Sequence, residues 1–395
     1  MSAADDTLQD PRTREAAVML QVYEQLPFMP TQAAGCDLVT TSGQRILDFW
    51  GGHAVAALGH GHPRLVQAIC EQTRQLLFQS NAVALDVRAA AAEQLVGIAP
   101  KNLSRVFFVN SGAEAIENAL RMACLATGGR QKILALTHGF HGRTAAAGAV
   151  TWSSADSWYG FPNTPFAVDF IPRNDVAAAE SMIDESVAAV IFEPVQGVAG
   201  AFDLSPDFVA ALRERTSRAG ALLISDEVQC GMGRSGHYFA IEAYRAEPDL
   251  LTTAKGLGGG IPCGALLCSE RISKTVGQGS LGSTFGGGPV AAAAIIAVIE
   301  TIKAEGLLAN VRQREAEIRE HCVTGPIQSV QGMGLLLGLV CDRPAGEIRD
   351  ALLQHDILTG TSADPGVLRL LPPLVLQAEH VRRLAKALDA IAPKT

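Results

Sequence analysis

The sequence lacks an excess of basic residues, and charged residues of either sign are few. Its 395 residues include 32 Lys and Arg against 40 Asp and Glu, a formal net charge of −8, and charged residues make up 18% of the chain. The totals imply no basic face for a phosphate polymer, so we expect no nucleic-acid partner. Hydrophobic residues make up 48%, which excludes a disordered chain.

No apolar run is long enough to cross a bilayer. The longest, residues 290–299, lies between Pro289 and Glu300 and is about half of the ~20 residues that a membrane-spanning helix needs. The chain begins with an acidic segment and has no signal-peptide pattern. We therefore expect no membrane partner and a cytoplasmic location.

The eight cysteines form no C-x-x-C pair and have no histidine partners at metal-ligand spacing. His60 with His62, and His138 with His141, stand beside glycines and far from any carboxylate-rich helix. We expect no metal site, and thiols that are reduced and mostly buried.

Apolar runs alternate with helical spacing through the middle of the chain. Strands are predicted at residues 105–109, 132–137, 188–195, 221–226 and 264–269, and helices at residues 113–126, 176–185 and 206–218. Towards the C-terminus, helices are predicted at residues 289–303, 307–322 and 377–391, with strands at residues 334–341 and 367–371. This order predicts an α/β fold with a mostly parallel sheet in a large domain, plus a smaller α+β domain.

We place the domain boundaries from the same pattern. Residues 61–290 are predicted to form the large domain, which carries the ligand site, and residues 291–395 the C-terminal small domain. Residues 1–60 are predicted to be an N-terminal segment that contributes to the small domain.

Two polar residues stand where ligand sites form. Asp226 ends a predicted strand, and a carboxylate at the carboxyl edge of a parallel sheet can hold a proton on a ligand. Lys255 precedes a glycine-rich turn, and lysine amines form Schiff bases when burial or a nearby cation lowers their pKa. Taken singly, Asp226 is better explained as a cap of the next turn, and Lys255 as a surface lysine.

Two further segments suit a phosphate. The string NSGA at residues 110–113 follows a predicted strand and opens a helix, where free N–H groups and the helix dipole favour an anion. An ordinary N-cap explains the same residues equally well. The loop at residues 282–288 offers hydroxyl groups on glycines, suited to phosphate oxygens or to no ligand.

The string GQGSLG at residues 277–282 fits the G-x-G-x-x-G pattern of dinucleotide-binding folds. No convincing strand precedes it, and another glycine loop follows instead of a helix. We interpret this match as chance, although it leaves a nicotinamide-dependent oxidoreductase as an alternative.

A phosphate cradle, an acid for a pyridinium nitrogen and a Schiff-base lysine are together what pyridoxal 5′-phosphate requires. The sequence resembles the class III aminotransferases, most closely their acetylornithine branch. The matching strings are LGHGHP (residues 58–63), NSGAEA (110–115), FHGRT (140–144), EPVQG (193–197), DEVQCGMG (226–233), TTAKGLGGG (252–260), TFGG (284–287) and RLLPPL (369–374). This resemblance implies fold type I of the pyridoxal phosphate-dependent transferases.

The resemblance also implies roles for single residues. Lys255 and Asp226 would be catalytic: Lys255 carries the cofactor covalently and moves the proton, and Asp226 pairs with the ring nitrogen. The implied cofactor-binding residues are Ser111, Gly112, Ala113, Phe140, Asp226, Gln229, Lys255 and Thr284, with Thr284 reaching the phosphate from the second subunit of a homodimer with shared active sites.

For the substrates, the resemblance implies that Arg143 contacts the carboxylate of the amino donor and Arg369 that of 2-oxoglutarate, with Ser283 as a further contact. The implied reaction moves an amino group from N-acetylornithine, or a similar ω-amino donor, to 2-oxoglutarate. Alternatives are a carrier-protein-linked lysine or ornithine aminotransferase of lysine biosynthesis, another ω-aminotransferase that acts on 4-aminobutyrate or ornithine, and a non-catalytic protein that holds the cofactor.

Three positions depart from the family pattern. Val198 replaces a glutamate that, in related enzymes, pairs with the arginine at the Arg369 position. Residues 80–84 (SNAVA) lack the aromatic residues that relatives often have near the substrate, and His53 replaces a small aliphatic residue. Either the donor differs or the pocket lining has drifted neutrally.

Overall fold

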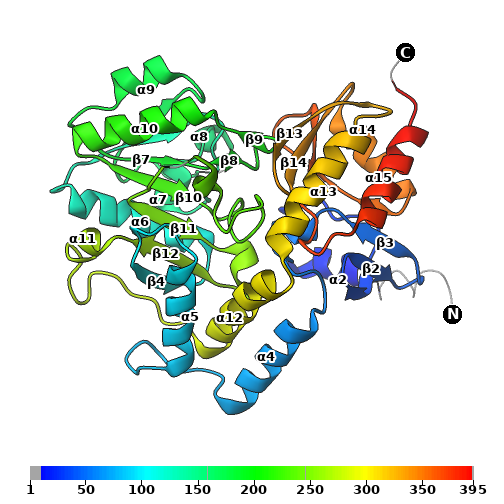
Figure 1. The fold of residues 1–395 in the computed structure, drawn as a ribbon, viewed down its shortest axis with the longest axis horizontal. Coiled ribbons are helices and arrows are strands. Elements are labelled where there is room, and N and C mark those ends of the chain that lie inside the picture. Colours follow the sequence, from blue (N-terminus) through cyan, green and yellow to red (C-terminus); the bar gives the residue numbers. More distant parts are fainter. Residues whose placement is uncertain (1–9, 158, 245, 394–395) are drawn as a thin grey trace.

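The computed structural model describes residues 10–157, 159–244 and 246–393. A seven-stranded sheet forms the centre of the elements on the left of Figure 1. Its strand order is β4 (Arg105–Val109), β12 (Gly264–Cys268), β11 (Leu250–Thr253), β10 (Leu222–Asp226), β7 (Val187–Phe192), β5 (Lys132–Leu136) and β6 (Ala167–Ile171). Strand β12 is antiparallel to β4 and β11, and the other neighbours are parallel, which confirms a mostly parallel sheet.

Helices cover this sheet, and their ends follow from local sequence. Helix α6 (Gly112–Ala126) begins after the N-cap Ser111 and packs against β11 and β12. Helix α10 (Pro206–Ala219) has proline in its first turn, ends at a left-handed Gly220, and packs against β7 and β10. Helix α9 (Val176–Met182) lies beside α10. These helices agree with the sequence prediction to within a few residues.

Two four-stranded sheets lie on the right of Figure 1. One has the order β1 (Pro30–Ala34), β2 (Asp37–Thr40), β3 (Arg45–Asp48) and β15 (Ile357–Leu358); the other has β13 (Ile327–Met333), β14 (Leu336–Cys341), β17 (Val367–Leu370) and β16 (Gly360–Thr361). Strand β3 pairs in parallel with β15, so the N-terminal and C-terminal segments share one sheet. The contribution of residues 1–60 to a small domain stays a prediction.

Helix α12 (Pro289–Ala304) packs against α4 (Pro63–Gln75) and α5 (Asp86–Gly97), at the bottom of Figure 1. The predicted domain boundary at residue 290 therefore falls at the start of α12, a helix that packs against helices from the N-terminal side of the boundary. The position of this boundary stays a prediction. The remaining elements are α2 (Pro11–Val18), α3 (Gly51–Ala54), α7 (Ala145–Ala149), α8 (Ser154–Ser157), β8 (Val195–Gln196), β9 (Phe202–Asp203), η1 (Ala240–Tyr244), η2 (Lys255–Gly258), α11 (Glu270–Ser273), α13 (Leu307–His321), α14 (Ala345–Gln354) and α15 (Ala378–Ala390).

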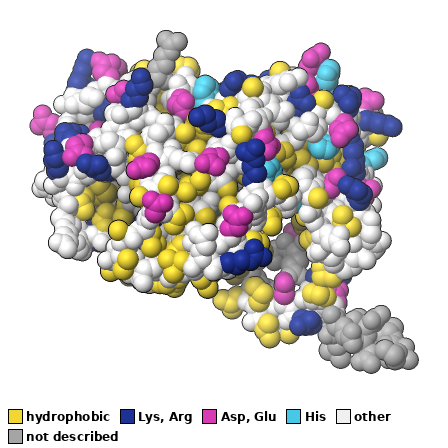
Figure 2. All heavy atoms as spheres, turned by 60° about the horizontal axis from the view of Figure 1, so that its bottom comes forward, with side chains coloured by type: hydrophobic (Ala, Val, Ile, Leu, Met, Phe, Trp, Pro, Cys, Tyr) yellow, Lys and Arg dark blue, Asp and Glu magenta, His cyan; other side chains and the backbone are white. Residues whose placement is uncertain are grey.

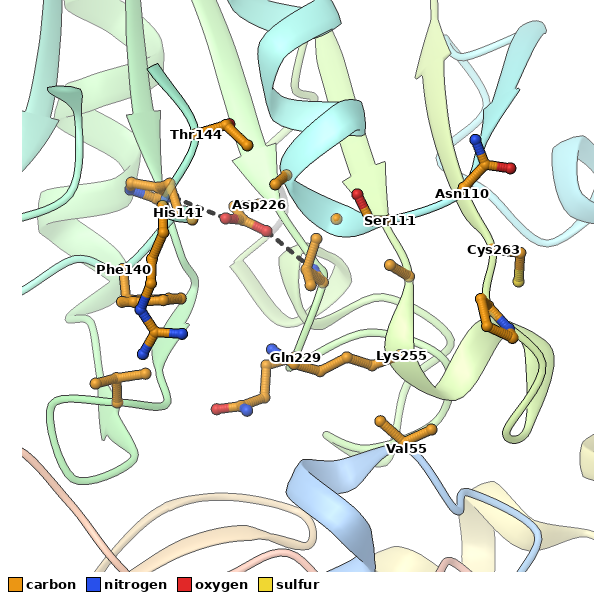
Figure 3. Close-up of a pocket in the computed structure, with 18 of the residues that line it drawn as sticks. Val55, Asn110, Ser111, Phe140, His141, Thr144, Asp226, Gln229, Lys255 and Cys263 are labelled. Atoms are coloured by element: carbon orange, nitrogen blue, oxygen red, sulfur yellow. Dashed lines mark hydrogen bonds and ion pairs between the residues drawn. The ribbon is translucent and has the colours of Figure 1, made fainter. Parts of the chain in front are cut away.

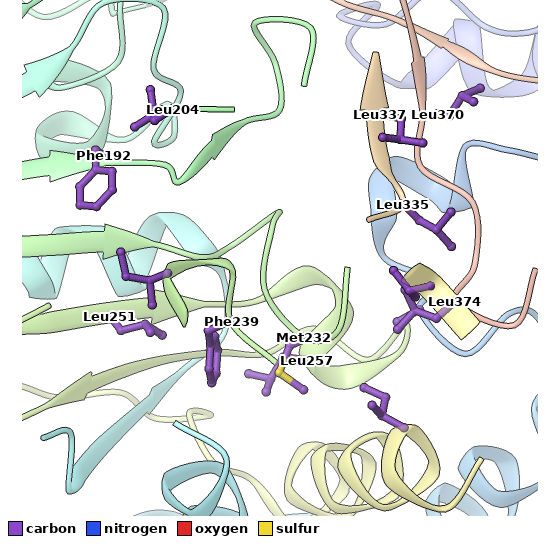
Figure 4. Packing of buried hydrophobic residues seen from close by; sticks show 14 of the residues in the cluster. Phe192, Leu204, Met232, Phe239, Leu251, Leu257, Leu335, Leu337, Leu370 and Leu374 are labelled. Carbon is purple, nitrogen blue, oxygen red and sulfur yellow. The ribbon is translucent and has the colours of Figure 1, made fainter. Parts of the chain in front are cut away.

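One hydrophobic cluster joins the central sheet to the C-terminal sheet. Figure 4 shows Phe192 and Leu251 on the side of the central sheet, Leu337 and Leu370 on the other side, and Met232 with its neighbours between them. Because this packing is continuous, the loop after β10 has a fixed position between the two sheets. No helix among the described residues is long and apolar enough to cross a membrane.

Candidate active site

A cavity of about 550 Å³ opens at the carboxyl edge of the central sheet, where open α/β sheets bind ligands. Eight of the eleven residues named from the sequence line it: Ser111, Gly112, Ala113, Phe140, Arg143, Asp226, Gln229 and Lys255. The structure thus brings together residues that are far apart in the chain (Figure 3). Ser283, Thr284 and Arg369 are not among the residues that line the cavity.

Asp226 is the last residue of β10 and is buried. Its Oδ2 lies 2.7 Å from Nδ1 of His141, a distance at which a ring N–H donates to a carboxylate. Its Oδ1 accepts from the backbone N–H of Val228 at 3.0 Å and from Oγ1 of Thr252 at 3.4 Å. Asp226 therefore caps the following turn and also lines the cavity. Its interpretation as a cap and its interpretation as a residue of a ligand site are thus compatible.

Two residues of the site received no role from the sequence. His141 belongs to the FHGRT string, and its ring holds Asp226 while its Nε2 is buried without a partner among the described residues. Glu193 belongs to the EPVQG string and accepts from the backbone N–H of Phe140 at 2.8 Å and of Gly197 at 3.3 Å. Burial, opposed by His141, raises the pKa of the Glu193 carboxyl to about 7. The shared strings were the signal that could have found both residues.

Lys255 stands two residues after the end of β11 and opens η2 with a left-handed φ of 44°. Such a conformation costs about 1–3 kcal/mol in a residue with a side chain and persists where the surroundings fix it. Burial lowers the pKa of the Lys255 ammonium, although the charges of Asp226 and Glu193 raise it. Figure 3 shows Lys255 at the cavity with Gln229, on the side nearer to Val55 than Asp226 is. Lys255 thus lines the cavity and is not a surface lysine, and its predicted role as a nucleophile stays a prediction.

The N-terminus of α6 faces the cavity. Ser111 is its N-cap, since its side chain accepts from the backbone N–H of Glu114 at 3.2 Å, and Gly112 and Ala113 are the first helical residues. The first N–H groups of a 15-residue helix, together with its dipole, favour an anion here. The N-cap and the anion cradle are therefore built from the same residues.

Arg143 and Phe140 form the side wall of the cavity. The Arg143 guanidinium lies over the Phe140 ring at 5.2 Å from its centroid. This contact holds a cation beside an aromatic face at the edge of the site.

Arg369, on β17, lies behind the segment that carries Val198. It donates from Nε to the carbonyl of Thr361 at 2.7 Å and from Nη1 to that of Gly197 at 3.1 Å, and burial lowers its pKa to about 10. In the chain as described, no carboxylate lies within ion-pair distance of this guanidinium. The guanidinium also lies 5.0 Å from the centroid of the Trp50 ring, and its predicted role in binding a carboxylate stays a prediction.

The loop at residues 282–288 carries the two remaining predicted residues. Ser283 Oγ accepts from Nδ2 of Asn110 at 3.2 Å and from the backbone N–H of Gly286 at 3.0 Å, so it braces the cavity wall from behind. Thr284 is exposed. Contacts of Thr284 with a cofactor in a second chain, and of Ser283 with substrate, stay predictions. The string at residues 277–282 lies between α11 and α12, with no strand directly before it.

The residues present fit pyridoxal 5′-phosphate. The cavity has a volume of about 550 Å³ and combines an anion cradle, a carboxylate, a reactive amine and an aromatic ring. Gln229 adds a buried Oε1 that has no hydrogen-bond partner in the described part of the chain. Fold and site together fit an enzyme that uses this cofactor, with Lys255 and the N-terminus of α6 as the residues that would hold it.

Comparison with known proteins gives the family. The family profile described as "Aminotransferase class-III" matches residues 18–392, so the chain belongs to the class-III aminotransferases. It is 36% identical to the acetylornithine aminotransferase of Methanocaldococcus jannaschii over 387 residues, which cover 94% of this chain and 95% of that one.

Solved structures agree. An ornithine aminotransferase from Toxoplasma gondii superposes with a TM-score of 0.91 at 27% identity and covers 98% of this chain and 96% of that one. An N-acetylornithine aminotransferase from Stenotrophomonas maltophilia gives a TM-score of 0.80 at 30% identity, with 94% and 96% covered. The chain is therefore a pyridoxal phosphate-dependent transaminase that uses a small-molecule amino donor and a keto-acid acceptor, as its sequence predicted.

Proposed function

We propose that this chain transfers an amino group from N-acetylornithine to 2-oxoglutarate, giving the semialdehyde and glutamate, in the cytoplasm. The names of relatives that match nearly the whole chain support this donor. The observation that carries the acceptor is Arg369, a buried cation held by the carbonyls of Thr361 and Gly197 with its remaining N–H groups free for a carboxylate.

The residues divide the work as follows. Bound pyridoxal phosphate supplies the electron sink for the carbanion. Asp226 holds a proton on the ring nitrogen, and His141 orients Asp226. Lys255 attaches the cofactor and then moves a proton to or from the substrate carbon, a task that its lowered pKa suits.

Other residues bind and orient. Ser111, Gly112 and Ala113 hold the phosphate at the start of α6, while Gln229 bonds the ring oxygen and Phe140 stacks on the ring. Arg143, beside Phe140, takes the donor's carboxylate.

We also propose a homodimer in which Thr284, with Ser283 beside it, completes the partner's site. Support comes from exposed apolar side chains: Phe78 and Phe285 are 41% and 64% exposed, and their rings lie 5.2 Å apart. Figure 2, which brings the bottom of Figure 1 forward, shows hydrophobic side chains gathered on the lower left of that face. Apolar surface of this kind marks an interface.

A half-reaction without acceptor tests the proposal. Enzyme with bound cofactor is mixed separately with N-acetylornithine, ornithine, 4-aminobutyrate, lysine and glutamate, and the loss of the cofactor's visible band is followed. We expect fast conversion by N-acetylornithine and glutamate alone. Conversion by glutamate but not by N-acetylornithine would overturn the donor and point to another amine, such as a carrier-bound one.

A further inference from the structure

The segment after β3 contains a complete left-handed turn. Gly51, Gly52, His53 and Ala54 have φ angles of 54°, 57°, 65° and 68°. Left-handed conformation costs residues other than glycine about 1–2 kcal/mol each, so His53 and Ala54 adopt it only because the surroundings fix them. Strained backbone of this kind concentrates where a side chain must be aimed.

Contacts on both sides of the turn fix it. Oδ1 of the buried Asp48 accepts from the backbone N–H groups of Trp50 and Gly51, both at 2.8 Å, while its Oδ2 lies 2.9 Å from His60 Nε2. A Cβ at Gly51 would lie 2.7 Å from the carbonyl oxygen of Leu371, so only glycine fits there. The turn is therefore clamped between a buried carboxylate and the chain that follows β17.

The turn aims His53 at the neighbourhood of Arg369. The His53 ring meets Trp50 edge to face with centroids 4.6 Å apart, and the Arg369 guanidinium lies 5.0 Å from the centroid of the same indole. A Cβ at Gly360 would lie 1.5 Å from the indole, so Trp50 packs directly on the backbone of β16, whose Gly360 pairs with Arg369. One immobile indole thus places both side chains.

The His53 imidazole is available to a ligand. The residue is exposed, and its ring nitrogens have no hydrogen-bond partner within residues 10–157, 159–244 and 246–393. Partial burial, then the charges of Arg369, Lys255 and Arg143, lower its pKa and so favour the neutral ring, and a neutral imidazole carries one N–H donor. Its nearest charges are therefore those of the proposed active site.

Resting on the proposed function, we propose that His53 is a specificity-determining residue for the keto acid. Its ring N–H donates a further hydrogen bond to the carboxylate that Arg369 binds. Arg369 spends two of its five N–H groups on the carbonyls of Thr361 and Gly197, which limits how it can enclose a carboxylate alone. The ligands in question are 2-oxo acids and the matching α-amino acids, not ω-amines that leave Arg369 empty.

Binding of glutarate, a five-carbon dicarboxylate without the reactive group, tests this proposal by calorimetry on the holoenzyme. His53→Phe keeps the ring against Trp50 and removes the N–H. We expect about tenfold weaker glutarate binding, the value of a hydrogen bond to a charged group, and a matching rise in the Michaelis constant for glutamate with kcat and the N-acetylornithine half-reaction unchanged. His53→Gln, which restores an N–H donor, should recover most of the affinity.

His138→Phe is the matched control. His138 is also left-handed, with φ 66°, and its ring centroid lies 5.8 Å from that of Trp152. This variant therefore makes the same substitution at a left-handed histidine that contacts a different tryptophan. Its glutarate affinity should equal that of the wild type. If His53→Phe unfolds early, His53→Gly, which tolerates left-handed backbone and carries no donor, takes its place with the same expectation.

The proposal would be overturned if His53→Phe bound glutarate as tightly as the wild type. It would also be overturned if the variant kept its glutarate affinity and only its dimerisation, followed by gel filtration, changed. Failure of the wild type to react with glutamate would instead contradict the proposed function. The two failures are therefore distinguishable.

Discussion

Two groups of residues around the cavity are held in place by different kinds of contact. In the sheet group, Ser111, Asp226 and Lys255, each residue lies just past or at the end of a strand of the central sheet. Asp226 is held by the side chain of His141, and Ser111 by its own helix. Regular secondary structure thus places the residues that we propose to meet the cofactor.

In the arginine group, Trp50, Val198 and Arg369, backbone carbonyls and close packing against β16 have this task. Arg369 bonds two carbonyls, and Trp50 packs on the backbone of Gly360. We infer that the sheet group sets whether any transfer occurs, and that the arginine group sets which carboxylate is accepted. Substitutions in the sheet group should slow the reaction with every substrate alike. Substitutions in the arginine group should slow it with some substrates only.

The largest effect is expected for Lys255→Ala. The variant loses both the covalent attachment and the proton carrier, so turnover should fall by about 10⁴-fold or more with every substrate. Gel filtration should release the cofactor from the variant and not from the wild type. Substantial residual turnover would contradict the role of Lys255.

Asp226→Asn should follow. The side chain keeps its shape but loses the charge that stabilises a proton on the ring nitrogen. Turnover should therefore fall by about 10³-fold, which corresponds to about 4 kcal/mol in activation free energy. The loss should again be equal for N-acetylornithine and glutamate in single-turnover experiments. Selective loss of one substrate would break the division between the groups.

Glu193 links the two groups and should show itself in pH dependence. Because burial raises its pKa to about 7 in the folded chain, ionisation opposes folding, and stability is lost as pH rises from about 4.5 through about 7. Glu193→Gln removes that loss, which amounts to about 3 kcal/mol. The melting temperature of the variant minus that of the wild type should therefore increase from pH 5 to pH 8.

Glu227→Gln is the control for this experiment. Burial also raises the Glu227 pKa to about 7, but its carboxylate accepts from the backbone N–H groups of Ala240 and Ile241, away from the cavity lining. The melting temperature of Glu227→Gln should also rise relative to that of the wild type as the pH increases. The Michaelis constant of this variant for the keto-acid acceptor should equal that of the wild type. A melting-temperature difference for Glu193→Gln that is constant with pH would show that Glu193 stays ionised.

The smallest effect is expected for Val198→Glu. A carboxylate there, next to the Gly197 carbonyl that Arg369 binds, would pair with the guanidinium and compete with substrate carboxylates. Glutamate conversion should slow several-fold while ω-amino donors gain. An unchanged donor profile would mean that Val198 only fills space.

Much of this site could be predicted because its residues follow strands. The apolar run ending at Asp226 and the cap at Ser111 are local patterns, and the structure has β10 and α6 within a residue of the predicted ends. The His141–Asp226 bond could not be predicted, since the residues are 85 positions apart and only the sheet's strand order brings them together. Local sequence carries no record of such pairing.

The left-handed turn was equally hidden. Two glycines before His53 permit it, but Asp48, which holds it, and Leu371, which excludes a side chain at Gly51, act through tertiary contacts. Strand β6 was missed as well because it alternates exposed and partly buried residues at the sheet edge and has no long apolar run.

Single-turnover half-reactions of Arg369→Ala test the account most directly. With glutamate, the variant should lose about 10²-fold in kcat/KM, because the carboxylate loses charge-assisted hydrogen bonds in a buried site. With N-acetylornithine, the rate should stay within about threefold of the wild type, since the Asp226 and Lys255 side of the site is intact. An equal loss with both substrates would contradict the separation of transfer from carboxylate selection.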